Sequence, residues 1–453
     1  MSTSIKKMLS FTVAVVLTTG SAIAQEHSLD DYIRQALLSN ESVKQKQFQL
    51  EKAVYGLKEA KSLFLPTVSL QANYTRAEGG RMIDFPIGDL LNPVYSTLNQ
   101  LTASQSFPMV QNASIQLNPD NFYDAKFRTV LPLINAEIWY NKEIKKQVVS
   151  QQQAAINVYK RQLVKDVKEA YFRYYQASNE VEIYTNALKL VNENIRVNES
   201  LYKNGIRNST ALTRAQAEKQ KIDAALTNAN SNKSNARMYF NFLLNQPFDT
   251  EILIDTNAVA EMNEPILKQD AVVDKREELY QLSVAKDIYT LSRNLQQSHL
   301  IPKLNTFLDL GSQGFNWKVD DKSKYYMWGI NLQWDLFASN QYRYKAKQAT
   351  AELKSIEVQE QQTKKALEMQ LQNAYNSFNA AFASCRSAQN QLTLSEKYYK
   401  DQMKMYKEGQ LTYIELLDAQ NQLISSQLQL SVAIANTRIA ASEIERCSAS
   451  YSI

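Results

Sequence analysis

Residues that usually carry catalysis or bind metals are scarce in this chain of 453 residues. It holds two histidines and two cysteines, which nearly excludes a His/Cys metal cluster. No nucleophile elbow, metal triad or phosphate-binding loop is visible. The 51 basic and 46 acidic residues form no dense basic patch of the kind that nucleic acid requires. We therefore expect no enzyme, no cofactor and no nucleic-acid partner.

The acidic residues of most interest are Glu415 and Asp418. They lie three positions apart at the start of an expected helix and so share one face. Glu415 also completes a capping box with Thr412, which is an ordinary structural reason for an acid at this position. The sequence thus offers two carboxylates on one helix face, of which Asp418 is the stronger functional candidate.

The elements that position these acids are very long helices. The chain has only 10 glycines and 9 prolines, each about 2% of its residues and well below the usual share. Residues 136–203 and 338–408 contain neither, so each predicts a helix about 100 Å long. One apolar seam runs from Val181 to Ile195, and two adjacent seams follow Gly409. Two seams indicate a helix packed between two neighbours.

The N-terminus has the pattern of a secretory signal peptide. Lys6 and Lys7 precede an apolar run, and small residues stand before Gln25. We expect residues 1–24 to be removed and the mature chain to lie outside the cytoplasm. Such a chain would be soluble, attached to a surface, or a β-barrel in an outer membrane.

The chain is an internal duplication with an offset of about 204 residues. Tyr202-Lys203-Asn204-Gly205 recurs as Tyr406-Lys407-Glu408-Gly409. Leu65-Pro66 and Ile301-Pro302 form another pair whose larger offset implies an insertion of about 32 residues in the first copy. Each copy is expected to run helix, two strands, long helix, tight turn, helix, and the two prolines mark where strands begin.

The expected strands alternate between apolar and polar residues. Val68, Leu70 and Tyr74 do so in the first copy, and Tyr326 to Trp334 in the second. A transmembrane barrel strand shows this alternation, and so does a half-buried strand of a soluble sheet. The signal peptide and 25 tyrosines favour the membrane interpretation. Segment 79–121, which holds four prolines, is expected to be an exposed loop; the alternative is that Phe85, Phe107 and Met109 plug a barrel mouth.

Four strands are too few to close a barrel, since about eight are the minimum. Open sheet edges facing lipid would leave backbone groups without hydrogen bonds, at several kcal/mol each. If the strands lie in a membrane, several chains must share one barrel. Two chains would give a plugged bore and three would give room for a pore; the residues alone do not decide between them.

Taken in order, these features resemble the TolC-like outer-membrane efflux proteins, the exit ducts of tripartite pumps and type I secretion systems. The resemblance rests on the strand-entry prolines, Leu133-Ile134, Leu336-Phe337, the duplicated turn, and the segment from Tyr413 to Gln420. It implies an α+β membrane protein with two repeats, a helical coiled-coil tunnel, and a transmembrane β-barrel to which each chain of a homotrimer gives four strands. It also implies the outer membrane of a Gram-negative bacterium, a periplasmic adaptor, and an inner-membrane pump of RND, ABC or MFS type.

The resemblance assigns roles to individual residues. Gly205 and Gly409 would form the periplasmic entrance and the adaptor-docking tip. Asp418 and Glu415 would line that entrance as carboxylate rings, which favour cations. In the first copy the matching positions are Ala211 and Arg214, and Arg214 would pair with Asp418 or remain a solvated charge. Leu411 stands where the family has a basic latch residue.

The expected organisation has four parts. They are a signal peptide (1–24), a first efflux repeat (25–247), an equatorial linker (248–265) and a second repeat (266–453). Within the first repeat we expect a strand pair at about 66–134, a long helix at 136–203 and a helix at 209–245. Within the second we expect a strand pair at about 302–337, a long helix at 339–407 and a helix at 412–447. The expected function is a passive duct for small molecules or polypeptides; the alternative is a periplasmic coiled-coil adaptor.

Overall fold

The fold was obtained as a computed structural model that describes residues 28–260 and 273–453. The expected signal peptide lies outside these residues, as does the end of the expected linker. The chain divides into two compact units. The helical unit comprises the described parts of Met1–Lys44, Tyr159–Val273 and Leu367–Ile453, and the sheet unit comprises Gln45–Val158 and Asp274–Ala366.

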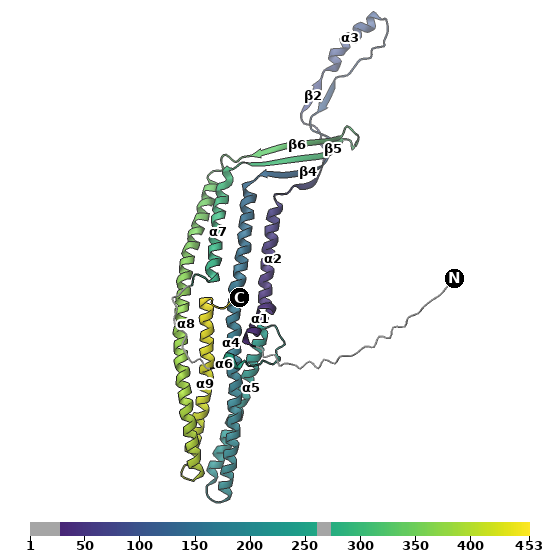
Figure 1. The fold of residues 1–453 in the computed structure, drawn as a ribbon. Helices are drawn as coiled ribbons and strands as arrows, with labels where there is room; N and C mark the ends of the chain where they lie inside the picture. The colour runs from purple at the N-terminus through teal and green to yellow at the C-terminus, as the bar shows by residue number, and fades with distance from the viewer. Residues whose placement is uncertain (1–27, 261–272) are drawn as a thin grey trace, which may run out of the picture. The chain divides into compact units, whose positions relative to one another are not determined.

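Helices dominate both units (Figure 1). The elements in chain order are α1 (Leu29–Ser39), α2 (Glu41–Ser62), β1 (Thr67–Thr75), β2 (Met82–Phe85), α3 (Ile87–Leu101), β3 (Ala113–Gln116), β4 (Phe122–Ile134), α4 (Ala136–Lys203), α5 (Ser209–Leu243), α6 (Thr256–Val259), α7 (Glu277–Gln297), η1 (Ser298–Leu300), β5 (Lys303–Phe315), β6 (Lys324–Gln333), α8 (Gln341–Lys407) and α9 (Tyr413–Ser448). Within the described residues, none of the helices combines the length and the apolar character needed to cross a membrane.

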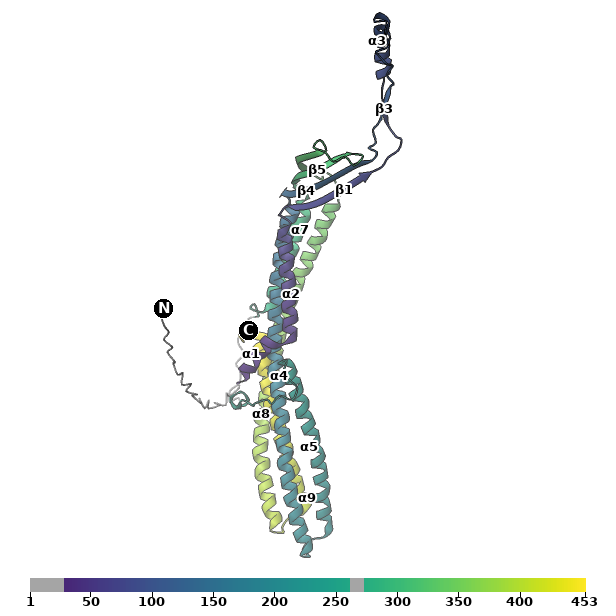
Figure 2. The same cartoon turned by 90° about the vertical axis from the view of Figure 1, so that its right-hand side faces the viewer.

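The helical unit is built from two helical hairpins, α4–α5 and α8–α9, whose members run side by side (Figure 2). Val191 of α4, Ile222 of α5 and Ile424 of α9 meet in one buried cluster. On another side of α9, the Thr437 hydroxyl donates to the carbonyl oxygen of Ala381 in α8. Helix α9 therefore packs between α8 and the other hairpin, as its two seams predict.

The first helix of the chain is interrupted, although the sequence predicted a single helix up to Leu65-Pro66. Asn40 has extended backbone angles between α1 and α2. Its side-chain oxygen accepts from the backbone of Ser42 and Val43, and its amide donates to the carbonyl oxygen of Leu243 at 2.9 Å. Asparagine forms such local caps readily, so it ends α1 and begins α2. At the start of α1, Ser28 and Asp31 form the expected capping box.

The linker and the C-terminus pack on the same core as α1 and α4. Ile252 is buried there, the Tyr32 hydroxyl accepts from the backbone of Leu253, and Tyr451 packs against the cluster. Burial raises the pKa of the Tyr171 hydroxyl, which contacts the backbone of Asp255, to about 12. The linker is thus anchored by buried tyrosines.

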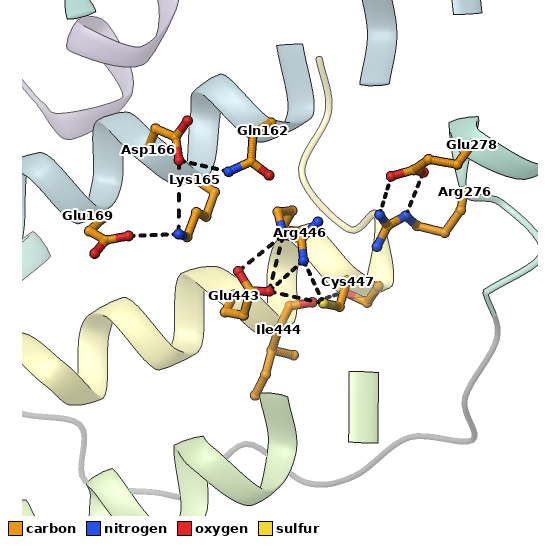
Figure 3. Close-up of polar contacts among 11 residues, drawn as sticks. Gln162, Lys165, Asp166, Glu169, Arg276, Glu278, Glu443, Ile444, Arg446 and Cys447 are labelled. Atoms are coloured by element: carbon orange, nitrogen blue, oxygen red, sulfur yellow. Dashed lines mark hydrogen bonds and ion pairs between the residues drawn. The ribbon is translucent and has the colours of Figure 1, made fainter. Parts of the chain in front are cut away.

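Figure 3 shows polar contacts within α4, such as Lys165 with Glu169, and within the end of α9, such as Arg446 with Glu443. Lys168 pairs with Glu445 at 2.5 Å, and Arg446 pairs with Glu443 at 2.6 Å. Burial would raise the pKa of Glu443, but the hydrogen bonds from Arg446 outweigh it, so the pKa of Glu443 lies below its usual value. The Lys168–Glu445 pair joins the end of α9 to α4, whereas Arg446 and Glu443 pair within α9.

The sheet unit contains a four-stranded antiparallel sheet in the order β1-β4-β5-β6. The central pairing joins the two copies of the repeat: Phe127 of β4 lies opposite Leu310 of β5. Strands β1 and β6 are its edges. Strands β1 and β5 begin directly after Pro66 and Pro302, because the residue before proline avoids the helical region and proline itself donates no hydrogen bond.

The insertion of the first copy has regular structure, so the expectation of a simple loop at 79–121 was wrong. Strands β2 and β3 pair with each other, and α3, which lies between them in sequence, extends beyond the end of the pair (Figure 1). Four prolines did not prevent this, because Pro86 caps α3 and Pro108 lies in the return segment. Only Pro93 lies inside the helix.

Candidate functional site

The two glycine turns at the ends of the hairpins have the same geometry. Gly205 has φ of +72° and Gly409 has φ of +76°. After α4, the amide of Gly205 bonds to Tyr202 and that of Ile206 to Leu201; after α8, the corresponding bonds are made by Gly409 and Gln410. These are Schellman caps, which require a left-handed residue at the cap. A Cβ added at either glycine would meet nothing within 4 Å, so backbone conformation alone selects glycine there.

Beyond the turns, the two hairpins are held together by a small core. Tyr406 of α8, Tyr413 and Leu416 of α9 and Ala215 of α5 are buried against one another. Burial also raises the pKa of Tyr413. Tyr406 is 2% exposed, whereas Tyr202, its equivalent in the first copy, is 49% exposed. The duplicated tyrosines thus differ: one holds the core and the other faces solvent.

Three polar contacts cross between the hairpins at this end. The Arg207 guanidinium donates to the carbonyl oxygen of Leu411 at 2.8 Å and lies over the ring of Tyr406. The Tyr406 hydroxyl donates to the Asn198 side chain at 2.5 Å. Further along, the Asn194 amide donates to Gln420 at 2.7 Å in a buried position. We call the residues of these three contacts the tip lock: Asn194, Asn198, Arg207, Tyr406, Leu411 and Gln420.

A second functional surface is the apolar face of the four-stranded sheet. Residues that pair across antiparallel strands lie on the same face, and one such row consists of Leu70, Phe127, Leu310 and Tyr326. All four are exposed, as are Val68, Trp328, Ile330 and Leu332 on the same face. Nothing in the described part of the chain covers this face.

The opposite face of the sheet carries charge. Arg128 of β4 forms two parallel hydrogen bonds with Asp309 of β5, at 2.8 and 2.7 Å. Lys126 pairs with Asp124 at 2.8 Å, and the Tyr325 hydroxyl donates to Asp124. The alternation of apolar and polar residues in the strands therefore produces one apolar and one ionic face.

Comparison with known proteins identifies this architecture. The sequence profile of the outer membrane efflux protein family matches residues 32–246 and 274–448. The chain belongs to the outer membrane efflux protein family. It is an outer-membrane efflux channel rather than a periplasmic adaptor. The two matched segments correspond to the two halves of the internal duplication.

Solved channels share the fold at low sequence identity. CmeC of Campylobacter jejuni is 13% identical with a TM-score of 0.73 over 93% of this chain and 85% of CmeC. VceC of Vibrio cholerae is 14% identical with a TM-score of 0.70 over 93% and 95%. MtrE of Neisseria gonorrhoeae, in its open state, is 14% identical with a TM-score of 0.73 over 93% and 88%. A search of curated protein sequences gave no match.

The predicted entrance acids of this efflux protein lie at the start of α9. Glu415 accepts from the Thr412 hydroxyl and backbone amide at 2.6 and 2.9 Å, and these bonds hold the pKa of Glu415 below its usual value. Glu415 thus acts as the predicted cap. Asp418 is exposed one turn later. Arg214 is also exposed, and within this protomer it forms no ion pair with Asp418 among the described residues.

The sequence analysis missed Arg207, which links the hairpins instead. Its position carried a signal: Arg207 and Leu411 are separated by 204 residues, the offset of the duplication. The backbone of Leu411 is therefore contacted by the arginine at the equivalent position of the first copy.

Proposed function

We propose that three copies of this chain form one exit duct, in which each copy contributes four strands to a shared barrel in the outer membrane. The sheet is the observation that carries this proposal. Its apolar face is bare, its ionic face contains Arg128 and Asp309, and its edges β1 and β6 have no partner strand among the described residues. An apolar outer face and a polar inner face are what a membrane barrel with a water-filled bore requires.

Identical copies supply the missing edges. Strand β6 of one copy can pair with β1 of the next, and repetition of this contact closes a ring. Closure removes the unpaired backbone groups that lipid does not tolerate. Three copies would give twelve strands, enough for an open bore, whereas two would give a bore filled by side chains. Channels of this family are trimeric, which favours three.

The glycine turns would then form the periplasmic end of the duct. We assign them as the docking tip for a periplasmic adaptor that connects the duct to an inner-membrane pump. Efflux channels of this family work with such partners. Transport energy would then come from the pump. The pump would also select the cargo, which is either small molecules or polypeptides.

In the trimer, each exposed Asp418 would become part of a ring of three carboxylates at the entrance. Such a ring lowers the energy of cations and raises that of anions in the pore. Glu415 is already engaged by Thr412, so Asp418 is the residue that we assign to cation selectivity. Arg214 has the freedom to reach Asp418 of a neighbouring copy, which would lower the net charge of the ring.

A matched pair of substitutions tests the membrane assignment. Ile330 lies on the apolar face of β6, and its neighbour Asn331 lies on the ionic face. Ile330→Lys should cost about 2–4 kcal/mol near the bilayer midplane and reduce the amount of trimer in outer-membrane extracts. Asn331→Lys should leave the trimer at the wild-type level. Equal tolerance of both substitutions, or recovery of the wild-type chain as a soluble periplasmic monomer, would contradict the proposal.

A further inference from the structure

The inserted helix α3 carries an exposed seam with coiled-coil spacing. Ile87, Leu90, Val94, Thr97 and Leu101 follow one another at intervals of three, four, three and four residues, which is the a/d pattern of a heptad repeat. All five are exposed, and Leu90 and Leu101 are 69% and 78% exposed. A surface helix that packs on its own domain would bury this stripe. Here the stripe remains bare.

The other side of α3 is already occupied by the return segment of the chain. Asn92 exchanges two hydrogen bonds with the backbone of Val110, at 3.0 and 2.8 Å. Seven residues later, Asn99 exchanges two with Phe107, at 2.7 and 3.1 Å. A Cβ at Gly88 would lie 2.4 Å from the Val110 carbonyl oxygen, so glycine permits this close approach. The insertion is therefore a single helix fixed to its return segment, and the seam is an apolar side of α3 that remains exposed.

The charges around the seam favour a copy of the same helix as the partner. Asp89 is the only residue of α3 that is charged at neutral pH, and Asn112 donates to it at 2.9 Å. The positions beside the seam hold Leu91, Pro93, Leu98 and Gln100, none of which is charged. Identical helices placed in parallel bring like charges together, and this helix has none there to repel.

The connectivity of the sheet brings such copies close. The chain enters the insertion directly after β1, which is an edge strand of the sheet. In the proposed duct, β1 is the strand that meets the next copy, and rotational symmetry gives all α3 helices the same direction along the axis, so a bundle of them would be parallel. A helix of 15 residues is too short to associate strongly by itself. Attachment to an assembled barrel raises its effective concentration to about millimolar.

We propose that the α3 helices of neighbouring copies associate through the seam Ile87–Leu101 into a parallel helical bundle on the inserted hairpins. This inference rests on the proposed assembly of identical copies. The bundle would add a contact between protomers outside the sheet and would restrict access to the space that it covers. A lipid surface is the competing partner for an apolar helix face, and the experiment below distinguishes the two.

Disulfide trapping in the full-length chain tests the bundle. The native Cys385 and Cys447 are first replaced by serine, and a single cysteine is introduced as Leu90→Cys or Val94→Cys. Facing a or d positions of a parallel bundle bring Cβ atoms close enough for a disulfide. Mild oxidation in outer-membrane fractions should therefore yield covalent dimers. Ser96→Cys, which is exposed on α3 but outside the seam, should yield only the background of the cysteine-free variant.

The possible outcomes test the proposed bundle and the proposed duct separately. A native mass of three copies without crosslinking at Leu90→Cys or Val94→Cys would overturn the bundle and leave the duct intact. A monomeric native mass would overturn both. Fluorescence of a probe on Leu90→Cys that brominated lipid quenches in proteoliposomes would place the seam in the bilayer and would also overturn the bundle.

Discussion

The tip lock makes a quantitative prediction at Arg207. Replacement by methionine keeps an unbranched apolar stem over Tyr406 but removes the guanidinium that donates to the Leu411 carbonyl oxygen at 2.8 Å. A hydrogen bond from a charged donor contributes about 1.5–3 kcal/mol, and an exposed cation–π contact about 0.5–1 kcal/mol.

Both contributions are smaller here, because solvent reaches the groups that make the contact. Arg207 and Leu411 are both half-buried, so water can replace part of the lost interaction at the carbonyl oxygen. We expect a net loss of about 1–2 kcal/mol, which raises the population of separated hairpins about 5- to 30-fold. The separation would be confined to the turns, because the buried contacts of Tyr406 with Asn198 and of Asn194 with Gln420 still join the hairpins further along.

Hydrogen exchange on the detergent-purified protein measures this population directly. Amides on both sides of the turns, in residues 199–210 and 403–415, should exchange faster by that factor in Arg207→Met, whereas amides of α1 should not change. Because we assign the turns to the entrance, we expect the current through the reconstituted channel to rise in parallel.

Arg196→Met is the matched control. Arg196 lies on α4 before the same turn and pairs with Glu193, but both side chains are largely exposed and the pair does not cross between hairpins. It should leave exchange and current unchanged. Wild-type exchange in Arg207→Met, or the same acceleration in Arg196→Met, would refute the assignment of Arg207 to the tip lock.

Three further predictions concern the same end of the helices. Gly409→Ala should destabilise the turn by about 1 kcal/mol through its positive φ alone, measured as faster local exchange; because the added methyl has free space, a much larger loss would contradict the backbone explanation. Glu415 has a lowered pKa, so its contribution to the start of α9 is present at neutral pH and is lost as the pH falls through that pKa; local exchange in wild type should rise on acidification, and Glu415→Gln should abolish this pH dependence. Asp418→Ala should weaken the block of current by multivalent cations in planar bilayers, and an unchanged block would remove Asp418 from the entrance.

Much of the fold followed from local patterns in the sequence. The long helices α4 and α8 follow from runs without glycine or proline, because nothing in them interrupts the backbone hydrogen bonds. The reversals at Gly205 and Gly409 follow from a residue type that alone adopts positive φ without strain. The starts of β1 and β5 follow from Pro66 and Pro302, because the residue before a proline avoids the helical region.

The errors came where a local pattern was compatible with two structures. Asn40 breaks the first helix because its side chain reaches the carbonyl oxygen of Leu243, about 200 positions away in sequence, and no local pattern encodes that contact. The proline-rich segment 79–121 appeared irregular, yet reciprocal bonds of Asn92 and Asn99 with the return segment fix that segment along helix α3. In both cases the deciding contacts are hydrogen bonds between asparagine side chains and the backbone of another segment.

The sequence by itself determined the length of the helices, the positions of the turns and the alternation of the strands, because each depends on the conformational preferences of neighbouring residues. Only the tertiary structure decided that β4 and β5 pair to join the two repeats, that Tyr406 is buried while Tyr202 is exposed, and that Arg207 rather than Arg214 links the hairpins. These features depend on which residues distant in sequence come within contact distance, and in a duplicated chain the two copies offer nearly the same local patterns for different roles.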